Sequence, residues 1–269
     1  MNEKLTIPDV GSLCYECRGS GPDLLLVHGF ASSLRVWDPL VAALEADFRC
    51  WAVDLAGCGG SHASPDQQFT LDEHVALLLA FAREHNLKPR AVIGHSMGGM
   101  LTLKLALAAP DLAERLVLVC PTVTGKYFWG ANYLVAAPVV QHLLLLTRPL
   151  WDVLQAQAVK PLLVIPHYLD MTVRERTRDD FRRTSWGAAM SAIAGITAEN
   201  LGPRLPEIQQ PTLVIVGCHD DMVPPSEGRY AAHTLPHAAL LEVPHAHHLP
   251  LDEAPDETLP AIRAFLSGP

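Results

Sequence analysis

Hydrophobic and polar residues follow two patterns along the chain: short apolar runs and longer stretches with helical spacing. The short runs are bounded by glycine, proline or polar residues, which is typical of strands buried in a sheet. They cover residues 12–18, 23–28, 48–53, 90–95, 116–120, 212–217 and 239–243. The helical stretches cover residues 36–45, 71–85, 97–109, 226–234 and 256–266. This alternation predicts an α/β fold, with a mostly parallel sheet covered by helices on both faces.

Local signals refine two of these elements. Residues 19–22 read Gly-Ser-Gly-Pro, a strong turn signal between the first two runs, so we expect a β-hairpin there. Thr70 precedes the helix expected at residues 71–85, and Glu73 follows three positions later. This spacing predicts a capping box at the start of the helix.

The alternation is interrupted between residues 122 and 206. This segment reads as helices without a clear strand and is rich in leucine, alanine and tryptophan. Because it stands between two strands of the sheet, we expect a lid above the carboxyl edge, where open α/β sheets bind ligands. Residues 1–121 and 207–269 are then the core, and residues 122–206 are the lid.

Composition narrows the function classes. Of the 269 residues, 49% are hydrophobic, which is ample for a large core, and the formal net charge is −9. An acidic surface repels phosphate backbones and anionic lipid, so we expect neither nucleic acid nor a membrane as partner. The six cysteines are scattered, which favours small apolar fillers in a reducing compartment over a zinc or redox site. No signal-peptide pattern stands at the amino terminus, and we expect a cytoplasmic protein.

The sharpest chemical signal is Gly-His-Ser-Met-Gly at residues 94–98. It matches G-x-S-x-G between an apolar strand and a helix. A serine at such a tight turn has a strained backbone, and side chains in place of the flanking glycines would collide with neighbouring backbone. The turn lifts the Ser96 hydroxyl above the sheet and places the Met97 N–H at a helix N-terminus, where it can stabilise an oxyanion. We therefore predict that Ser96 is a nucleophile.

A second signal, Val-His-Gly-Phe at residues 27–30, directly follows an apolar strand. With the serine turn, it makes the sequence resemble the α/β-hydrolase superfamily, in which H-G-x after the third strand supplies a second oxyanion amide. The resemblance covers nearly the whole chain outside residues 122–206. It implies an eight-stranded, mostly parallel sheet with a helical lid after the sixth strand. It also implies an oxyanion hole formed by the amides of Phe30 and Met97, with His28 bracing the loop.

Residues 54–61 read Asp-Leu-Ala-Gly-Cys-Gly-Gly-Ser. They resemble the D-x-x-G-x-G-x-S stretch after the fourth strand in lidded members of the superfamily. A phosphate-binding glycine loop is the alternative, but G-x-G-x-x-G fails at His62 and no Walker lysine follows. We interpret the segment as a structural turn.

A serine hydroxyl is a weak nucleophile and needs an adjacent base. The chain has 13 histidines, and the superfamily order of serine, acid, histidine places both partners beyond Ser96. Residues 217–224 resemble the family pattern G-x-x-D-x-x-V-P, which places the acid at Asp220. The neighbouring Asp221 is the alternative.

Two adjacent histidines compete for the role of the base. The family pattern has an acidic residue five positions after the base, followed by x-Pro. From His248 this reaches Glu253, with proline at position 255, whereas from His247 it reaches Asp252 without that proline. We therefore predict His248 and keep His247, which stands where the family usually has glycine, as the alternative.

Together these residues imply an acyl-enzyme mechanism. His248 takes the Ser96 proton as the serine attacks a carbonyl, and Asp220 orients the imidazole and stabilises its charged form. The amides of Phe30 and Met97 hold the oxyanion. Water activated by His248 then releases the acyl group, and we expect neither a metal nor an organic cofactor.

The lid gives only general information on the substrate. Its aromatic and aliphatic residues pack onto the core or line a pocket for an apolar or aromatic ester-like small molecule. We name Trp129, together with His28 and Gly29, as candidate substrate-binding residues. Five arginines between residues 174 and 183 are interleaved with acidic residues. A solvated helix explains them, and a site for a substrate carboxylate is the alternative. We interpret His95, beside the nucleophile, as a packing residue.

Several functions share this set of residues. We predict hydrolysis of a carboxylic ester or related acyl compound. C–C bond hydrolases of ring-fission products, the main enzymatic alternative, usually show H-G-x-G-P-G where this chain reads H-G-F-A-S-S. Haloperoxidase-like members share H-G-F and the serine turn. A slow-turnover ligand receptor on the same fold is the alternative from another class. Monomer and homodimer both stay open.

Overall fold

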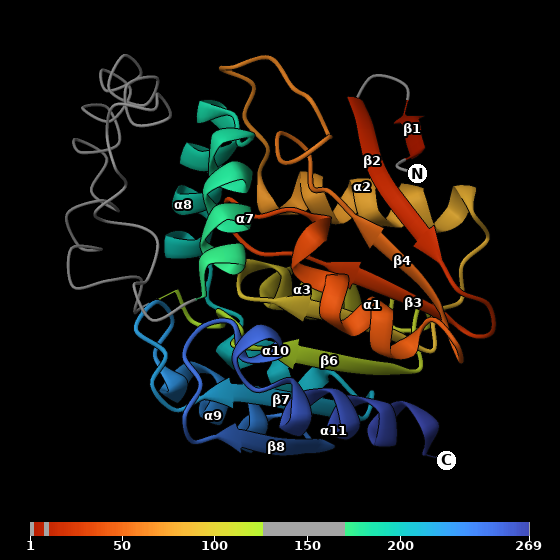
Figure 1. The fold of residues 1–269 in the computed structure, drawn as a ribbon, viewed down its shortest axis with the longest axis vertical. Coiled ribbons are helices and arrows are strands. Elements are labelled where there is room, and N and C mark those ends of the chain that lie inside the picture. The colour runs from red at the N-terminus through yellow and green to blue at the C-terminus, as the bar shows by residue number, and fades with distance from the viewer. Residues whose placement is uncertain (1–2, 8–10, 126–169, 269) are drawn as a thin grey trace.

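The computed structural model describes residues 3–7, 11–125 and 170–268. Eight strands form one sheet in the order β1-β2-β4-β3-β5-β6-β7-β8 (Figure 1). Their bounds are β1 Glu3–Ile7, β2 Gly11–Arg18, β3 Asp23–Val27, β4 Arg49–Val53, β5 Ala91–His95, β6 Arg115–Val119, β7 Thr212–Gly217 and β8 Ala238–Val243. Only the pairings of β2 with β1 and β4 are antiparallel within this sheet. The mostly parallel sheet is confirmed.

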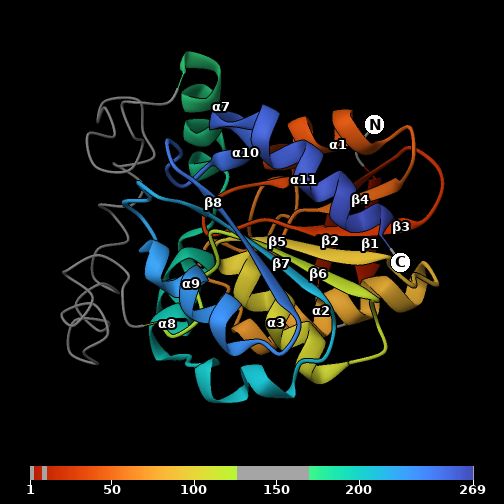
Figure 2. The same ribbon diagram turned by 90° about the horizontal axis from the view of Figure 1, so that it is seen from below.

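Helices cover both faces of the sheet (Figure 2). Helices α1 (Asp38–Leu44) and α11 (Pro255–Ser267) lie on one face, and α2 (Leu71–Glu84), α3 (Met97–Ala108) and α9 (Pro225–Thr234) lie on the other. Each strand therefore contributes to two cores. Leu25 and Val27 of β3 pack in the cluster on the α2 and α3 side, whereas Leu24 and Leu26 pack in the cluster on the α1 side. This period of two explains why the strands are continuously apolar.

The predicted hairpin between residues 12–18 and 23–28 is wrong. The chain does turn there, because Gly19 and Gly21 have φ of 85° and 113°. However, β4 lies between β2 and β3, and β3 pairs in parallel with β4 and β5. The turn packs against the residues before β4, since a Cβ at Gly19 would lie 2.3 Å from the carbonyl oxygen of Phe48. The strand β1 was not predicted.

Most other element bounds match the expectation within one or two residues. Strand β7 spans the expected residues 212–217, and α2 begins at Leu71 with the expected capping box. Thr70 Oγ1 accepts from the Glu73 amide at 3.2 Å, and Glu73 Oε2 accepts from the Thr70 amide at 2.7 Å. The helix expected at residues 36–45 is instead a 3₁₀ turn, Leu34–Trp37, followed by α1.

A segment is inserted between β6 and β7. Its described part contains α7 (Met171–Arg182), α8 (Trp186–Ala198) and the start of a 3₁₀ helix, Gly202–Glu207. The Leu201 amide donates to the Val123 carbonyl at 3.0 Å, so the segment leaves and rejoins the core at one place. There the buried Glu227 of α9 accepts from the amides of Val123 and Thr124 at 2.9 and 2.6 Å.

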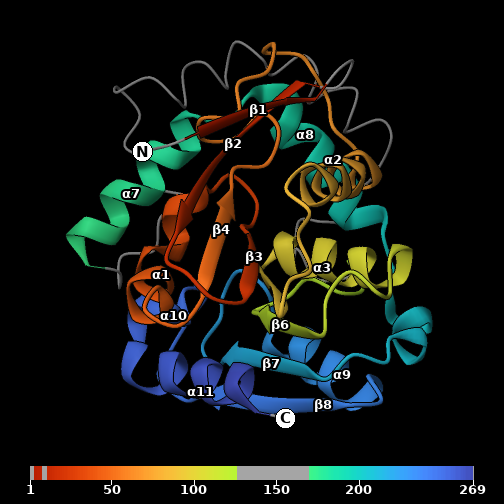
Figure 3. The same ribbon diagram turned by 90° about the vertical axis from the view of Figure 1, so that its right-hand side faces the viewer.

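The sheet is twisted, with β1 and β2 near one end and β8 at the other (Figure 3). Such a twist follows from the right-handed preference of each strand. Among the described helices, none combines the length and the apolar character that crossing a membrane requires.

Candidate active site

Ser96 occupies the turn between β5 and α3, at the carboxyl end of a central strand. Its backbone has φ of 56° and ψ of −120°, a conformation that non-glycine residues rarely adopt. The strain is maintained by fixed neighbours, since the Ser96 amide donates to the Val119 carbonyl at 2.9 Å and the Ser96 carbonyl accepts from the Thr122 amide at 3.2 Å. The arrangement matches a strand-to-helix turn that presents a hydroxyl.

The glycines of the motif are explained by close approach. A Cβ at Gly94 would lie 2.2 Å from the Gly98 carbonyl oxygen, and a Cβ at Gly98 would lie 2.1 Å from the Val27 carbonyl oxygen. Both distances are too short for any side chain. The turn can therefore form only with glycine on both sides of Ser96, as predicted.

The loop after β3 lies directly against the serine. A Cβ at Gly29 would stand 2.8 Å from Ser96 Cβ. Met97 is the first residue of α3, so its amide has no intrahelical acceptor. The Phe30 side chain packs in an apolar cluster with Trp186 of α8. Both predicted oxyanion residues, Phe30 and Met97, thus belong to segments that flank Ser96, and their role stays a prediction.

His28 is fully buried and is used by the main chain. Its Nδ1–H donates to the Gly29 carbonyl at 2.8 Å, and its Nε2 accepts from the Leu55 amide at 2.9 Å. Burial lowers the pKa of His28, which keeps the ring neutral. Both nitrogens are occupied, so the side chain braces the loop and offers no polar atom to a substrate.

Asp54 also braces the loop after β3, through its carboxylate. Its buried carboxylate accepts from the Leu34 amide at 2.6 Å and from the Gly60 amide at 2.7 Å. It therefore ties the glycine-rich turn after β4 to the loop after β3. A Cβ at Gly59 would lie 2.4 Å from this carboxylate. The segment is a structural turn, in agreement with the sequence interpretation.

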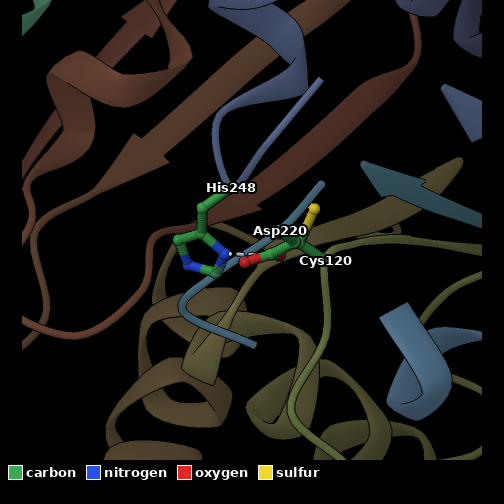
Figure 4. Close-up of side chains that lie close together, drawn as sticks. All are labelled: Cys120, Asp220 and His248. Carbon is green, nitrogen blue, oxygen red and sulfur yellow. Dashed lines mark hydrogen bonds and ion pairs between the residues drawn. The ribbon is translucent and has the colours of Figure 1, made fainter. Parts of the chain in front are cut away.

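Asp220 and His248 come from the loops after β7 and β8 and lie together (Figure 4). His248 Nδ1–H donates to Asp220 Oδ2 at 2.8 Å, and both side chains are buried. Asp220 Oδ1 accepts from the amides of Met222 and Val223 at 2.9 and 2.8 Å. Burial raises the pKa of Asp220, but His248 and these hydrogen bonds outweigh it, so the pKa lies below its ordinary value. Asp221 is exposed.

His247 is occupied elsewhere. Its Nδ1–H donates to Glu253 Oε2 at 2.8 Å, so its ring is not the partner of Asp220. Glu253 also accepts from the amides of His247 and Leu249 at 2.9 Å each. The acidic residue five positions after His248 thus holds the backbone on both sides of that histidine. This contact gives the family spacing a physical reason.

His95 makes a polar contact in addition to the packing predicted for it. Its Nε2–H donates to the His248 carbonyl at 2.8 Å, and the centroids of the two rings are 4.6 Å apart. Burial lowers the pKa of His95 to about 3, with the nearby His248 adding to the effect. The neutral ring therefore supports the His248 backbone without placing a positive charge beside the His248 ring. No local pattern in the sequence encodes this contact.

Cys120 stands next to the Asp220–His248 pair (Figure 4). One ligand atom from each of these three side chains lies within 4.8 Å of the others, the spacing that a metal ion needs. A metal at this position would have to displace the proton between Asp220 and His248. Burial raises the pKa of the Cys120 thiol well above its ordinary value, which disfavours the thiolate that would bind a metal.

The geometry of the described side chains suits general-base chemistry at His248. The Asp220 contact fixes the His248 tautomer with Nε2 unprotonated, which suits a general base. In the part of the chain that the structure describes, no hydrogen bond joins Ser96 Oγ to His248. Catalytic hydrogen bonds often tighten only when substrate binds. Trp129, the third candidate substrate residue, lies outside the described residues.

Comparison with known proteins decides the family. A family model described as "alpha/beta hydrolase fold" matches residues 22–255. The chain belongs to the α/β-hydrolase family. The predicted fold class is thereby confirmed. Several curated relatives are named as esterases and one similar solved structure as a hydrolase, so this family member is a hydrolase.

Three relatives illustrate the range of this hydrolase's neighbours. A pimeloyl-[acyl-carrier protein] methyl ester esterase of Nitrosomonas europaea is 27% identical over 95% of this chain and 100% of its own length. A putative non-heme bromoperoxidase, BpoC, of Mycobacterium tuberculosis is 26% identical over 96% of this chain and 98% of its own. A hydrolase from Pseudomonas aeruginosa PA01 superposes with a TM-score of 0.82 at 26% identity, covering 99% of this chain and 98% of its own.

Proposed function

We propose that this α/β-hydrolase cleaves a carboxylic ester through an acyl-enzyme formed on Ser96. His248 removes the serine proton, Asp220 stabilises the resulting imidazolium, and the amides of Phe30 and Met97 stabilise the oxyanion. Water then attacks the acyl-enzyme with His248 again as the base. Residues 122–206 act as the lid that selects the substrate.

The observation that carries this proposal is the buried hydrogen bond from His248 to Asp220, at 2.8 Å, together with a serine held at a φ of 56° at the same carboxyl edge of the sheet. A strained serine costs folding energy, and a buried acid–imidazole pair needs a specific environment. Their presence on loops at one edge of the sheet, after β5, β7 and β8, is explained by nucleophilic catalysis. The esterase named among the relatives supports an ester as the acyl substrate.

The substrate class is inferred from the surface beside the loop after β3. Phe30, Trp186, Phe181 and Met190 form a small cluster there that contains no charged side chain. Apolar surface next to the reacting carbonyl suits an apolar acyl or alcohol group. We therefore propose a small apolar or aromatic ester as the substrate, and methyl esters are the first class to test because one relative is named for that activity.

The test is hydrolysis of p-nitrophenyl and methyl esters of increasing acyl length by wild type and Ser96→Ala. The substitution should lower kcat on the order of 10⁶-fold with an unchanged fold, because the nucleophile is lost. The optimum acyl length in the wild type reports the size of the substrate pocket. A Ser96→Ala enzyme that keeps more than roughly a tenth of the activity would exclude Ser96 as the nucleophile.

A matched pair of variants tests the acid. Asp220→Asn should lower kcat on the order of 10⁴-fold, because the amide stabilises the wrong tautomer of His248. Asp221→Asn changes the same group one position away, on an exposed side chain, and should leave kcat within about twofold. Equal losses in the two variants would contradict the assignment of Asp220.

A further inference from the structure

Helix α7 carries the arginine-rich run that the sequence analysis interpreted as a solvated helix. That interpretation is wrong for two of its residues. The Asp180 side chain is 2% exposed and the Arg176 side chain is 13% exposed. They are four positions apart, so they lie on the same face of the helix, one turn from each other. This face is directed at the core of the protein.

Asp180 binds the loop that follows β3. Its Oδ1 accepts from Ser33 Oγ at 2.7 Å and from the Nε and Nη2 atoms of Arg35. Ser33 and Arg35 follow Phe30 by three and five positions. The Leu34 amide between them donates to Asp54, so the loop is held from the core on one side and from α7 on the other.

Arg176 binds the other side of the site. Its Nη1 and Nη2 donate to the two oxygens of Asp252 at 3.0 and 2.6 Å, a two-pronged contact with fixed geometry. Asp252 belongs to the short helix α10 (Pro250–Glu253), and its side chain is only 7% exposed. It follows His248 by four positions and precedes Glu253, which holds the backbone around His248.

The two contacts are joined within α7. Arg35 Nη2 also donates to the Arg176 carbonyl at 3.4 Å, so the Asp180 and Arg176 contacts share one turn of helix. Buried charge pairs add little net stability, because desolvation offsets their attraction. The directional hydrogen bonds of these pairs do, however, fix the positions of the two segments that they join. Apolar packing of the same helix would tolerate small displacements much better.

We propose that α7 is a brace between the oxyanion loop and the loop of the base, with Asp180 and Arg176 as positioning residues. The brace sets the separation of Phe30 from His248 across Ser96. The inference rests on the proposed function for its catalytic consequence. A displacement of about 1 Å in a reacting group can lower the rate on the order of 10²-fold. The brace would prevent displacements of this size and so maintain the catalytic rate.

The first measurement is steady-state hydrolysis by Asp180→Asn and Arg176→Met. Each should lower kcat roughly 10- to 100-fold while KM changes less than about threefold, because the displaced groups act on the oxyanion and the serine proton, whose charges develop only in the transition state. A boronic acid that mimics the tetrahedral intermediate should lose affinity by a similar factor. Arg176→Lys retains one donor to Asp252 and should recover part of kcat.

The matched control is Glu199→Gln. Glu199 follows α8 and pairs with Lys104 of α3 at 2.5 Å, so it also ties the inserted segment to the core by a charge. It contacts neither catalytic loop in the described structure. Its substitution should leave kcat within about twofold. If Glu199→Gln and Asp180→Asn lose the same kcat, the contact acts through general stability and the brace is excluded.

Hydrogen exchange gives a readout that does not depend on catalysis. Asp180→Asn should speed amide exchange in residues 29–37, and Arg176→Met should speed it in residues 246–254, with little change in the β7 strand. Unchanged exchange in both loops, together with wild-type kcat, would overturn the inference while leaving Ser96 hydrolysis intact. A wild type that is neither active on esters nor labelled at Ser96 by a fluorophosphonate would instead overturn the proposed function.

Discussion

Helices α7 and α8 follow each other in the inserted segment but are attached to the core in different ways. Helix α8 buries Ala188, Ala192 and Ile196 in the main hydrophobic cluster. Helix α7 buries Val173 and Asp180. Its Phe181 adds to the small cluster of Phe30 and Trp186, but its directional links to the core loops are ion pairs and hydrogen bonds. A Cβ on Gly187, at the start of α8, would lie 2.4 Å from the Gln67 carbonyl oxygen, so α8 lies in backbone contact with the loop after β4.

The difference indicates that one insertion can both stabilise its own attachment and align loops of the core. Small apolar residues on α8 supply the free energy that keeps the segment on the core, since burial of apolar area is the main stabilising term. Charged residues on α7 supply little net stability but fix direction and distance. Stability and alignment are therefore separable here, and substitutions on the two helices should affect different measurements.

The largest effect on stability is expected from Ile196→Ala on α8. Ile196 is 1% exposed within the main cluster, and truncation leaves a cavity that costs about 2–5 kcal/mol of unfolding free energy. Urea denaturation measures it, and Ile196→Val, which removes a single methyl group, should cost about 1 kcal/mol. A loss below about 1 kcal/mol for the alanine variant would mean that α8 does not anchor the segment.

Low pH should destabilise the fold through His74, which lies near helix α8. Its ring lies 5.7 Å from that of Phe69, whose amide donates to Ser191 of α8. Burial, with a contribution from His28, lowers the pKa of His74 from 6.5 to about 4. The unfolded chain therefore binds more protons between these values, and stability falls as the pH drops from about 6.5 to about 4, by roughly 3 kcal/mol.

His74→Phe removes this titration and should flatten part of the acid loss. Urea denaturation between pH 7 and pH 4 measures it. His62→Gln is the control, because His62 is exposed and its replacement leaves the buried His74 in place. Identical pH dependence in wild type and His74→Phe would show that another group controls acid unfolding.

The smallest effect is expected from Asp179→Ala on α7. Asp179 lies 3.9 Å from Arg182, and their side chains are 48% and 35% exposed. Exposed pairs of this kind contribute less than about 0.5 kcal/mol, so stability and kcat should stay at wild-type values. Asp180, the next residue, is buried, and the two aspartates thus give opposite results from adjacent positions. A large kcat loss in Asp179→Ala would remove the contrast.

The serine turn was predictable because its cause is local. The glycines at positions 94 and 98 are demanded by backbone contacts within a few residues and with the end of the neighbouring strand β3, and the apolar runs around them mark strand and helix. The candidate acid and base were predicted from the resemblance of two short loops to family patterns of spacing. The structure brings Asp220 and His248 together, although spacing alone could only rank them against Asp221 and His247.

The failures have a common origin in long-range pairing. The turn at residues 19–22 is real, but which strand lies beside β2 is decided by β4, more than 25 residues away. Asp180 lies 147 positions from Ser33, and Arg176 lies 76 positions from Asp252. A run of alternating charges looks the same whether it faces water or distant partners. The His95 contact with His248, 153 positions apart, was missed for the same reason.

The hydrogen bond between Leu201 and Val123 has a consequence for the history of the enzyme. Because the inserted segment departs and returns at neighbouring residues, its length can change without stretching the strands on either side. Glu227 of the core accepts from the amides of Val123 and Thr124 at this junction. The contact therefore does not depend on residues farther inside the insertion. Recombination at these two positions can therefore exchange one insertion for another on an unchanged sheet.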